Sequence, residues 1–246
     1  MVEISVVVVT LLDEDSIPSV QHLKSQEFDD YEIIVRDDPG ICAARNAGIR
    51  EANANKIVFI DDDAIPAEGY LQIASRALEQ HAVVAGRVVH PTGTVVSEFP
   101  GHYDQGPTGK STETIVGCNM AFRKDVFAEV GGFDEALQWG HDETELADRV
   151  LEEFDIYYEP EMVVEHSYAD GVIDYWNKMY RFGPADVYYG TKREDTTWKD
   201  GLATMFGPSS YLSKSLYGTF VKSVGRIVRN ISIAKTMVEN TVRTGE

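Results

Sequence analysis

Short apolar runs alternate with helical patterns over the first ninety residues of the chain. Four runs are rich in β-branched residues, which is typical of strands buried on both faces of a parallel sheet; they cover residues 4–9, 32–35, 56–60 and 83–86. The segments between them have helical periodicity or are rich in alanine, and they predict helices over residues 16–27, 41–53 and 68–80. This alternation predicts an α/β protein with a doubly wound, mostly parallel sheet flanked by helices.

The second half of the chain is less regular. Residues 87–111 are rich in Gly, Pro, Thr and His, which predicts loops and a hairpin. Beyond them, apolar patterns predict strands over residues 114–122 and 156–166, and helices over residues 125–130 and 143–154. The α/β pattern therefore continues to about residue 166, with a longer irregular insertion in its middle.

The last 45 residues, 202–246, differ in charge from the rest of the chain. They contain six Lys or Arg residues and two acidic residues, and their apolar residues recur at helical spacing. We therefore expect a main domain over residues 1–201 and a basic, amphipathic helical tail over 202–246. The tail fits an interfacial helix on an anionic membrane, a packed helical hairpin covering the domain, or an oligomer interface. Gly218 and Gly225 argue against one long straight helix, because glycine weakens helix interiors.

The overall charge narrows the function classes. The chain of 246 residues contains 22 Lys and Arg against 41 Asp and Glu, a net charge of −19. This is the wrong sign for a general nucleic-acid binder, so we expect no nucleic-acid partner. The acidic residues are spread along the sequence, which fits either an ordinary acidic surface or adaptation to a haloarchaeal, high-salt cytoplasm.

The sequence also bears on the cellular compartment. No apolar run reaches the ~18 residues that can span a bilayer, and no basic leader precedes the first strand. We therefore expect a cytoplasmic protein that the tail could hold at the cytoplasmic face of the membrane. Cys42 and Cys118 lie outside any CxxC or Cys/His motif, which predicts two separate reduced thiols, although sequence alone leaves a disulfide open.

Polar residues follow three of the predicted buried strands. Thr10 ends the first, Asp37 and Asp38 follow the second, and Asp61–Asp63 end the third. Ligands of such sheets bind at the carboxyl ends of the strands, so these residues are expected along one rim. Three adjacent carboxylates need a cation or hydrogen-bond donors unless they form a solvated turn. Mg²⁺ bound by one or two carboxylates and by phosphate oxygens would meet that need.

A second polar group opens the predicted helix over residues 41–53. Gly40 precedes it, and Arg45 lies in its first turns, within the sequence ARNAG. A glycine-led helix N-terminus favours anions, and Arg45 could reach a nucleotide there. The alternative is an ordinary surface arginine in an alanine-rich helix.

The order of these motifs resembles the inverting family 2 glycosyltransferases of GT-A fold. The matching pieces are GICAARNAG from Gly40, FIDDD from Phe59, GCNMAF from Gly117, GGFD from Gly131 and DETELADR from Asp142, within roughly residues 1–170. The resemblance implies a nucleotide-sugar half over residues 1–86, an acceptor half over 87–201 and a C-terminal helical extension.

The resemblance also implies roles for single residues. Nucleotide-sugar contacts are expected from Thr10, Asp37, Asp38, Gly40, Arg45, Asp61 and Asp62. A divalent cation, Mg²⁺ or Mn²⁺, would be held by Asp63 with Asp61, the pair that forms the family's DxD motif, and His166 would complete the site.

The expected catalytic residue is Asp142, aligned with the carboxylate that deprotonates the acceptor hydroxyl. It could equally cap the helix that continues at Glu143. Trp139 and His141 precede it and are candidates for acceptor or sugar contact, although Trp139 could be core filler. A sugar hydroxyl is a poor nucleophile, so one carboxylate base suffices for a single inverting displacement.

The expected reaction moves a sugar from a nucleotide-sugar, with UDP as the first choice, to an acceptor hydroxyl. A lipid-linked saccharide in glycan or glycoprotein assembly is one acceptor class that suits a membrane-bound tail. The alternatives are a non-catalytic nucleotide- or glycan-binding module on the same fold and a sugar nucleotidyltransferase. The latter usually has a basic, glycine-rich loop after the first strand, where this chain has Leu11-Leu12-Asp13-Glu14.

Two departures from the family pattern stand out. Asp38 is followed at once by Pro39-Gly40, where the family commonly has another helix and strand, so one helix–strand unit looks deleted. The family often has Glu-Asp at the base position, whereas this chain has His141-Asp142. The first departure bears on recognition of the nucleobase and the second on the surroundings of the base.

Overall fold

The structure is a computed structural model that describes residues 2–13, 16–91, 93–100, 102–192 and 211–244. The chain divides into two compact units, which are described separately. The first unit comprises Met1–His90, Gly101–Gln138 and Asp142–His166, and the second comprises Pro91–Pro100, Trp139–His141 and Ser167–Glu246. This grouping is one of spatial contact; the functional division at residues 86 and 201 stays a prediction.

A mixed sheet forms the centre of the first unit. In the described residues its strands are β1 (Ile4–Val9), β2 (Tyr31–Arg36), β3 (Lys56–Asp61), β4 (Ile65–Pro66), β5 (Val83–Val89), β6 (Lys110–Thr112), β7 (Asn119–Arg123) and β8 (Ile156–Glu165). Their order is β2-β1-β3-β7-β5-β8-β4, and β6 pairs with β8. The four buried runs predicted for the first ninety residues are all strands of this sheet.

Strand direction differs in part from the expectation of a mostly parallel sheet. β1 is parallel to β2 and to β3, and β5 is parallel to β8. β7 runs antiparallel between β3 and β5, and the short β4 and β6 are antiparallel to β8. β7 is apolar and buried like the mutually parallel strands β1 and β3, so its hydrophobicity predicts a buried strand but not its direction. The expected α/β fold with helices flanking a central sheet is confirmed.

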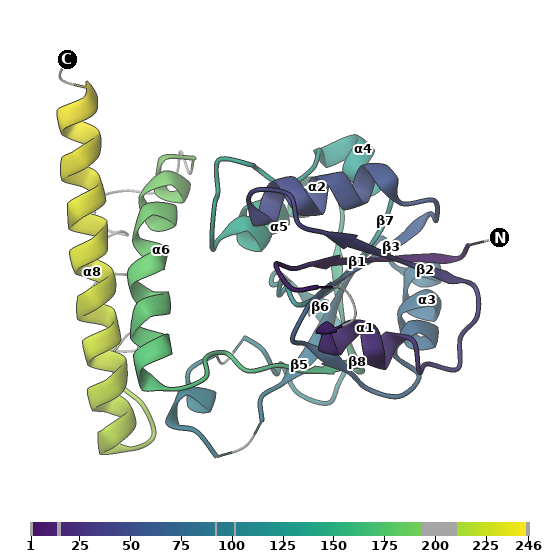
Figure 1. Cartoon of the computed structure of the whole chain (residues 1–246), viewed down its shortest axis with the longest axis horizontal. Helices are drawn as coiled ribbons and strands as arrows, with labels where there is room; N and C mark the ends of the chain where they lie inside the picture. The colour runs from purple at the N-terminus through teal and green to yellow at the C-terminus, as the bar shows by residue number, and fades with distance from the viewer. Residues whose placement is uncertain (1, 14–15, 92, 101, 193–210, 245–246) are drawn as a thin grey trace. The chain divides into compact units, whose positions relative to one another are not determined.

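Helices cover both faces of this sheet. Figure 1 shows α2 (Ile41–Glu51) and α4 (Val126–Val130) on one face, and α1 (Pro18–Leu23) and α3 (Tyr70–Gln80) on the other. α5 (Asp142–Glu153) packs against α4. On the α2 face, Gly48 lies so close to Val7 of β1 that a Cβ would collide with the valine methyl groups. Glycine at this position therefore sets how closely α2 approaches the sheet.

Asn119 is a polar residue at the centre of the sheet, with no exposed surface. Its Nδ2 donates to the carbonyls of Arg87 and Met162, each at 2.9 Å, and its Oδ1 accepts from the Tyr70 hydroxyl at 2.8 Å. Every hydrogen-bonding group of this side chain that points into the core has a partner, which offsets the cost of burying it. The start of β7 is thereby fixed against β5, β8 and α3.

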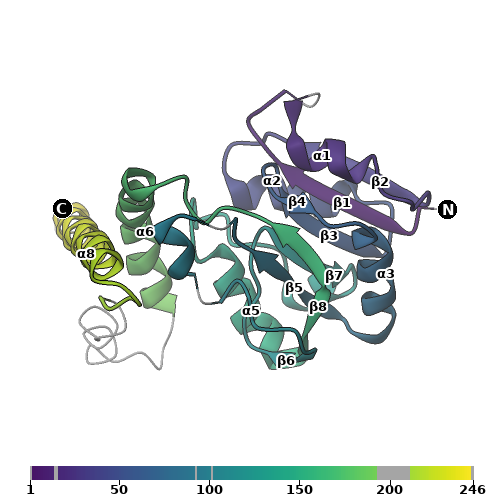
Figure 2. The same cartoon turned by 90° about the horizontal axis from the view of Figure 1, so that it is seen from below.

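Two long helices form most of the second unit. α6 (Val172–Lys192) and α8 (Leu216–Thr244) lie side by side in both views (Figures 1 and 2), with the short 3-10 helix η2 (Val95–Glu98) against them. The Trp176 indole donates to the Val221 carbonyl, and farther along Arg229 bonds Asp186. Because the contacts advance together along both helices, α6 and α8 run in the same direction.

This arrangement bears on two expectations about the tail, its helical character and a break at its glycines. The helical character of 202–246 is confirmed from Leu216 onward, while residues 202–210 and 245–246 lie outside the described residues. α8 continues through Gly218 and Gly225, so the expected break is wrong. Gly225 packs against the Tyr175 ring, where a side chain would collide. Close packing at this position offsets the helix-propensity cost of about 1 kcal/mol.

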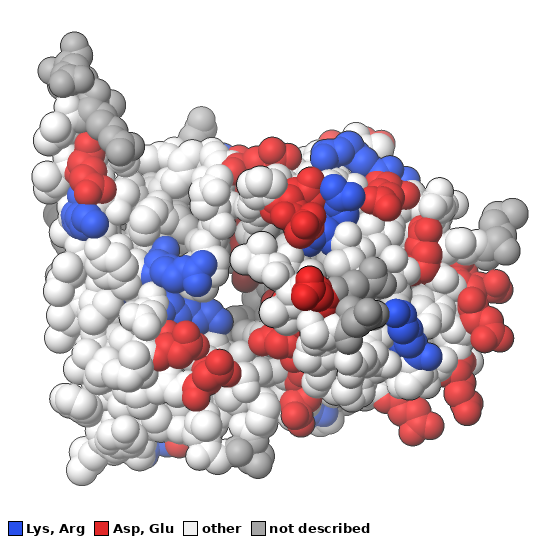
Figure 3. Space-filling view, in the orientation of Figure 1, with Lys and Arg blue, Asp and Glu red and all other residues white. Residues whose placement is uncertain are grey.

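Three further features concern the acidic surface, the hydropathy of the helices and the cysteines. In the space-filling view of Figure 3, acidic side chains are distributed over the face shown rather than gathered in one place. Among the helices of the described residues, none is long and apolar enough to cross a membrane. Both cysteines are buried and free, as expected for two separate thiols.

We predict that Gly48→Ala lowers the free energy of unfolding by about 1–3 kcal/mol, because the added methyl overpacks α2 against β1. Gly190→Ala is the matched control: this helical glycine is exposed and has open space around its Cβ position. There the better helix propensity of alanine should leave stability unchanged or raise it by up to about 1 kcal/mol. Denaturant unfolding followed by circular dichroism measures both, and an unchanged Gly48→Ala variant would contradict the packing argument.

Candidate active site

A buried arginine organises the rim of the sheet in the first unit. Arg45 of α2 is 3% exposed and forms an ion pair with Asp142, which is also 3% exposed and begins α5. Its other terminal nitrogen lies 3.3 Å from Asp61 at the end of β3 and donates to the Gly117 carbonyl at 3.2 Å. The alternative of a surface arginine is therefore wrong, and the predicted Arg45, Asp61 and Asp142 lie together.

Position 117 has to be a glycine, because the Arg45 guanidinium leaves no room for a side chain there. A Cβ at Gly117 would lie 2.7 Å from an Arg45 terminal nitrogen. The glycine carbonyl instead accepts one of the guanidinium hydrogen bonds, so the backbone before β7 is part of the site. The motif GCNMAF thus contributes backbone as well as side chains to the rim.

Within the acidic triplet Asp61–Asp63, the middle residue Asp62 has a partner of its own. Asp62 accepts a hydrogen bond from the Thr10 hydroxyl at 2.6 Å, which ties the ends of β3 and β1 together. Burial raises the pKa of Asp62, and the adjacent Asp63 and Asp61 raise it further against the lowering effect of Thr10. Crowded carboxylates of this kind gain from a cation that neutralises them.

His166 and Asp63 form the other side of the rim. His166 directly follows β8 and is largely buried, and its Nε2 lies 3.3 Å from Asp63 Oδ1. Its Nδ1 lies 3.3 Å from the Tyr103 hydroxyl, and its backbone N–H donates to the Val89 carbonyl. The imidazole is therefore held from two directions, with Nε2 facing the exposed carboxylate of Asp63.

Side chains able to hold a metal meet at this point. Ligand atoms of Asp61, Cys118 and His166 all lie within 4.8 Å of one another. Asp63 is not a member of this cluster, but its Oδ1 contacts His166 Nε2 at 3.3 Å. Carboxylate, imidazole and sulfur donors gathered this closely fit a divalent cation; of the expected metal residues, Asp61 and His166 lie in the cluster and Asp63 lies beside it.

Asp142 has a carboxylate neighbour that the motif comparison did not single out. Glu143 is partly buried beside it in the first turn of α5. Burial raises the pKa of Glu143, and the Asp142 carboxylate raises it further, to about 8. A carboxyl group that titrates near neutral pH, next to the residue expected to act as base, is a further candidate for proton transfer.

The residues expected around the nucleobase are less closely connected. Asp38 forms two hydrogen bonds with the Arg36 guanidinium, which hold the pKa of the Asp38 carboxyl below its usual range. Asp37 is exposed. Gly40 has a φ of 98°, a conformation that favours glycine, and stands directly before α2. Of the two carboxylates, Asp37 is the more accessible to a ligand.

Trp139 and His141 belong to the second unit. The Arg181 guanidinium lies 4.4 Å from the Trp139 ring centroid, and Phe182 packs beside that ring at 4.7 Å. His141 has a φ of 60° and places Nε2 2.8 Å from Asp186, while its ring stacks on Tyr189 at 4.9 Å. Both side chains thus have partners within the unit.

Asp186 connects His141 to α8. Burial would raise the pKa of Asp186, but hydrogen bonds from Arg229 and His141 lower it. Arg229 and Asp186 are both largely buried and form a two-pronged ion pair. The question that the sequence left open about His141 therefore has a structural answer: it contributes to a polar core between α6 and α8.

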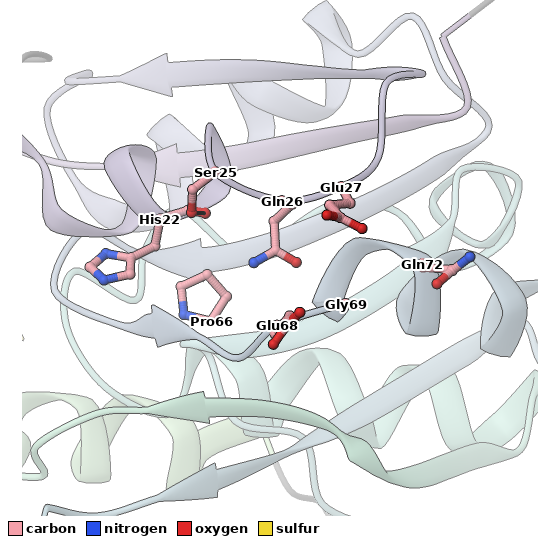
Figure 4. A pocket seen from close by; sticks show the side chains of 8 residues that line it. All are labelled: His22, Ser25, Gln26, Glu27, Pro66, Glu68, Gly69 and Gln72. Atoms are coloured by element: carbon pink, nitrogen blue, oxygen red, sulfur yellow. Dashed lines mark hydrogen bonds between the residues drawn. The ribbon is translucent and has the colours of Figure 1, made fainter.

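A pocket of about 540 Å³ lies elsewhere on the first unit, beside α1, β4 and the start of α3 (Figure 4). Its lining consists of His22, Ser25, Gln26, Glu27, Pro66, Glu68, Gly69 and Gln72. None of the expected site residues lines it, and the Gln26 amide donates across it to the Ala67 carbonyl. We assign the chemistry to the rim and not to this pocket.

Solved structures of other proteins share this fold. A mannosyltransferase from Pyrobaculum calidifontis, PcManGT, in complex with GDP-Man and Mn²⁺, aligns with 99% of this chain and 75% of its own at a TM-score of 0.56 and 15% identity. S. aureus TarS 1–349, in complex with UDP-GlcNAc, aligns with 93% of this chain and 90% of its own at a TM-score of 0.55 and 13% identity. The fold is thus that of the GT-A glycosyltransferases.

Sequence comparison gives matches to family models and to curated proteins. Residues 39–131 match the model of glycosyl transferase family 2, and residues 108–159 match a model described as the N-terminal domain of galactosyltransferase. Glycosyltransferase AglE of Haloferax volcanii is 29% identical over 148 residues, which cover 56% of this chain and 48% of that protein. A pre-mycofactocin glycosyltransferase of Mycobacterium tuberculosis is 26% identical over 179 residues, covering 64% of this chain and 36% of that protein. These matches support a family 2 glycosyltransferase, and the chain spans about half or less of these curated relatives.

Two site residues escaped the sequence reasoning. The sequence predicts Cys118 as a separate reduced thiol and gives Glu143 no role beyond continuing the helix that Asp142 could cap. Cys118 follows Gly117 in the motif GCNMAF, and Glu143 follows Asp142, so each stands next to a residue that was already singled out. The sequence signal that could identify them is that each directly follows a motif residue near the start of a strand or helix.

We predict that Glu143→Gln gains stability relative to the unchanged protein as the pH rises from about 5 to about 8. The folded protein holds the Glu143 proton more tightly than the unfolded chain does, where the ordinary value is 4.5. Its contribution to stability is therefore present below pH 4.5 and lost as the pH rises through about 8. Melting temperatures across this range measure the effect. Glu152→Gln, an exposed carboxylate on the same helix, should show no such trend.

Proposed function

We propose that this protein is an inverting, metal-dependent glycosyltransferase. It moves a sugar from a nucleotide-sugar donor to an acceptor hydroxyl. The carrying observation is the meeting of Arg45, Asp61 and Asp142 with Asp63 and His166 at one rim of a GT-A type sheet. A rim with both a metal-ligand cluster and a carboxylate base is what a displacement at a nucleotide diphosphate needs.

The roles follow the resemblance and fit the contacts. Thr10 and Asp62 shape the nucleoside end, Asp37 approaches the nucleobase, and Arg45 with Gly40 lies at the start of α2. Asp61, Asp63 and His166 would hold the cation, Mg²⁺ or Mn²⁺. When bound, the cation supplies positive charge to the diphosphate oxygens as the leaving group departs.

The reaction is a single displacement. The acceptor oxygen forms a bond to the anomeric carbon while the bond from that carbon to the diphosphate breaks, and the nucleoside diphosphate leaves with the electron pair. The hydroxyl proton passes to a carboxylate. Attack opposite the leaving group inverts the anomeric centre, so no carboxylate nucleophile is required.

Two carboxylates compete for the role of base. Asp142 has the aligned position, and its ion pair with Arg45 holds it in place. Burial and the neighbouring Asp142 carboxylate raise the pKa of Glu143 to about 8, so this carboxyl is mostly protonated at neutral pH and can accept a proton only after losing its own. We retain Asp142 as the proposed base, with Glu143 as the alternative to be compared directly.

We also propose the nucleotide of the donor and the kind of organism from which the protein comes. UDP remains the first choice, and GDP is the second because PcManGT is in complex with GDP-Man. A haloarchaeal source fits the net charge of −19 and the similarity to a Haloferax volcanii protein. The alternatives of a binding module and a nucleotidyltransferase would retain nucleotide binding but transfer no sugar.

The tail bears on the acceptor. α8 has an exposed apolar stripe opposite the face that packs on α6, formed by Leu216, Phe220, Ile227, Ile231, Val238 and Val242. Spacings of four and seven residues place them within a narrow arc of one helix. Lys235 lies beside the stripe and is exposed. We propose that this stripe lies on an anionic lipid surface at the cytoplasmic face of the membrane, where a lipid-linked acceptor would be presented.

Donor binding is the decisive test. With Mg²⁺ or Mn²⁺ at molar salt, we expect one of the UDP-, GDP- or dTDP-sugars to bind in calorimetry. Asp63→Ala should weaken that binding at least about tenfold by removing an exposed cation ligand. Asp125→Asn, an exposed acid on the same unit, is the matched control. Failure of every nucleotide-sugar to bind would overturn the transferase assignment.

Turnover separates the two candidate bases. Asp142→Asn keeps an oxygen that can accept a hydrogen bond from Arg45, and circular dichroism checks that it is folded. It should keep donor affinity within a few-fold and lose ~10²–10⁴-fold in kcat, because removing a general base costs about that much. Glu143→Gln should then lose less than tenfold and shift the pH profile. The reverse ranking would reassign the base to Glu143. Binding that persists in all variants with no turnover on any acceptor would favour the binding module.

Membrane contact has its own test. Replacing Ile227, Ile231 and Val238 together by Ser should abolish co-sedimentation with vesicles that contain phosphatidylglycerol, because the apolar surface is lost. Leu151→Ser, a partly exposed leucine of the first unit, should leave it unchanged. If the unchanged protein does not bind the vesicles but elutes as a dimer, and the triple variant elutes as a monomer, the stripe is a subunit interface instead.

A further inference from the structure

We propose that Cys118 is a ligand of the divalent cation at the rim, and that its thiolate makes the site prefer thiophilic cations such as Zn²⁺ or Co²⁺ over Mg²⁺. The inference rests on the proposed function only for the purpose of the cation, since the coordination can be tested without any donor. Neither the sequence motifs nor the comparisons assign Cys118 a role.

The first support is the position of the thiol. Its sulfur lies within 4.8 Å of ligand atoms of both Asp61 and His166. One sulfur, one imidazole nitrogen and one carboxylate oxygen make a mixed donor set that suits a thiophilic cation, and the proposed ligand Asp63 lies beside His166.

Strand direction explains why the cysteine reaches this place. Asn119 of β7 pairs with Ile60 of β3 in an antiparallel register, so β7 begins where β3 ends. The residue before β7 therefore lies beside Asp61. β8 is parallel to β5, and His166 follows its last residue at the same rim. Three separate segments thus bring their donors to one point.

The thiol is also held in place from both sides. Gly117 before it accepts a hydrogen bond from buried Arg45, and Asn119 after it makes three hydrogen bonds in the core. His166 is oriented by Tyr103 at Nδ1 and by its backbone bond to Val89. Hydrogen-bonded neighbours of this kind fix the geometry of metal ligands and support metal affinity.

Ligand chemistry sets the preference. Mg²⁺ takes oxygen ligands and keeps its waters, so a sulfur adds little to its binding. Zn²⁺ and Co²⁺ bind imidazole and thiolate well. Binding converts the Cys118 thiol to a thiolate and releases its proton to the solvent, while the cation gains the sulfur–metal bond; no oxidant or reductant takes part.

Cys42 provides a matched control within the same chain. It is likewise buried, but its thiol donates to the Leu137 carbonyl at 3.0 Å and lies in α2, away from the cation cluster. Burial raises its pKa to about 12, with the Asp142 carboxylate adding to the effect. Cys42→Ser therefore removes one buried thiol without touching the proposed ligands.

The experiment titrates the whole, chelator-treated protein with Co²⁺ under a reductant that contains no thiol, in the absence of donor. We expect a near-ultraviolet thiolate-to-cobalt charge-transfer band in the unchanged protein and in Cys42→Ser, and no band in Cys118→Ser or Cys118→Ala. Calorimetry should show Zn²⁺ affinity at least about tenfold weaker in the Cys118 variants, with Mg²⁺ affinity changed less than about twofold. Circular dichroism checks that both variants are folded.

The outcomes separate this inference from the proposed function. A band that persists in the Cys118 variants, or is missing from the unchanged protein, overturns the thiolate ligand. If donor binding with Mg²⁺ is then intact, the transferase proposal stands without it. A band that depends on Cys118, together with no binding of any nucleotide-sugar, supports the metal site and removes the transferase role.

Discussion

The buried guanidinium of Arg45 is the interaction on which the rim depends. It joins α2, the end of β3, the backbone before β7 and the first residue of α5 through Asp61, Gly117 and Asp142. A buried charge without a partner costs several kcal/mol, so loss of one member leaves the others strongly destabilised. The segments of the first unit that contribute chemistry are therefore coupled through a single side chain.

This coupling also organises the charges of a very acidic protein. Asp61, Asp62 and Asp63 stand in sequence in a chain of net charge −19, where repulsion would open the turn. Arg45 compensates Asp61, Thr10 donates to Asp62, and His166 faces Asp63. Each carboxylate has a different partner from a different segment, so the turn is held by tertiary contacts rather than by its own sequence.

The sequence anticipated those parts of the structure that depend on local pattern. The buried strands, α2, α3 and α5 follow from hydrophobic periodicity, and the rim position of Thr10 and Asp61 follows from the rule that parallel strands end together. The direction of β7 and the burial of Arg45 depend on partners distant in sequence, and periodicity contains no information on either. Cys118 was missed for this reason, since only an antiparallel β7 puts the residue before it beside Asp61.

The short connection after β2 affects how this edge of the sheet can pair with another molecule. The resemblance implies another helix and strand at that point, whereas in the described residues β2 is the outermost strand and pairs with β1 alone. Such an edge has open backbone groups and invites pairing with a strand of another molecule. Glu32 and Arg36 place charges along this edge. Glu32 accepts hydrogen bonds from Ser5 and Asn53, and Arg36 forms ion pairs with Asp38 and Glu51. A charged border of this kind discourages pairing of β2 with a strand of another molecule.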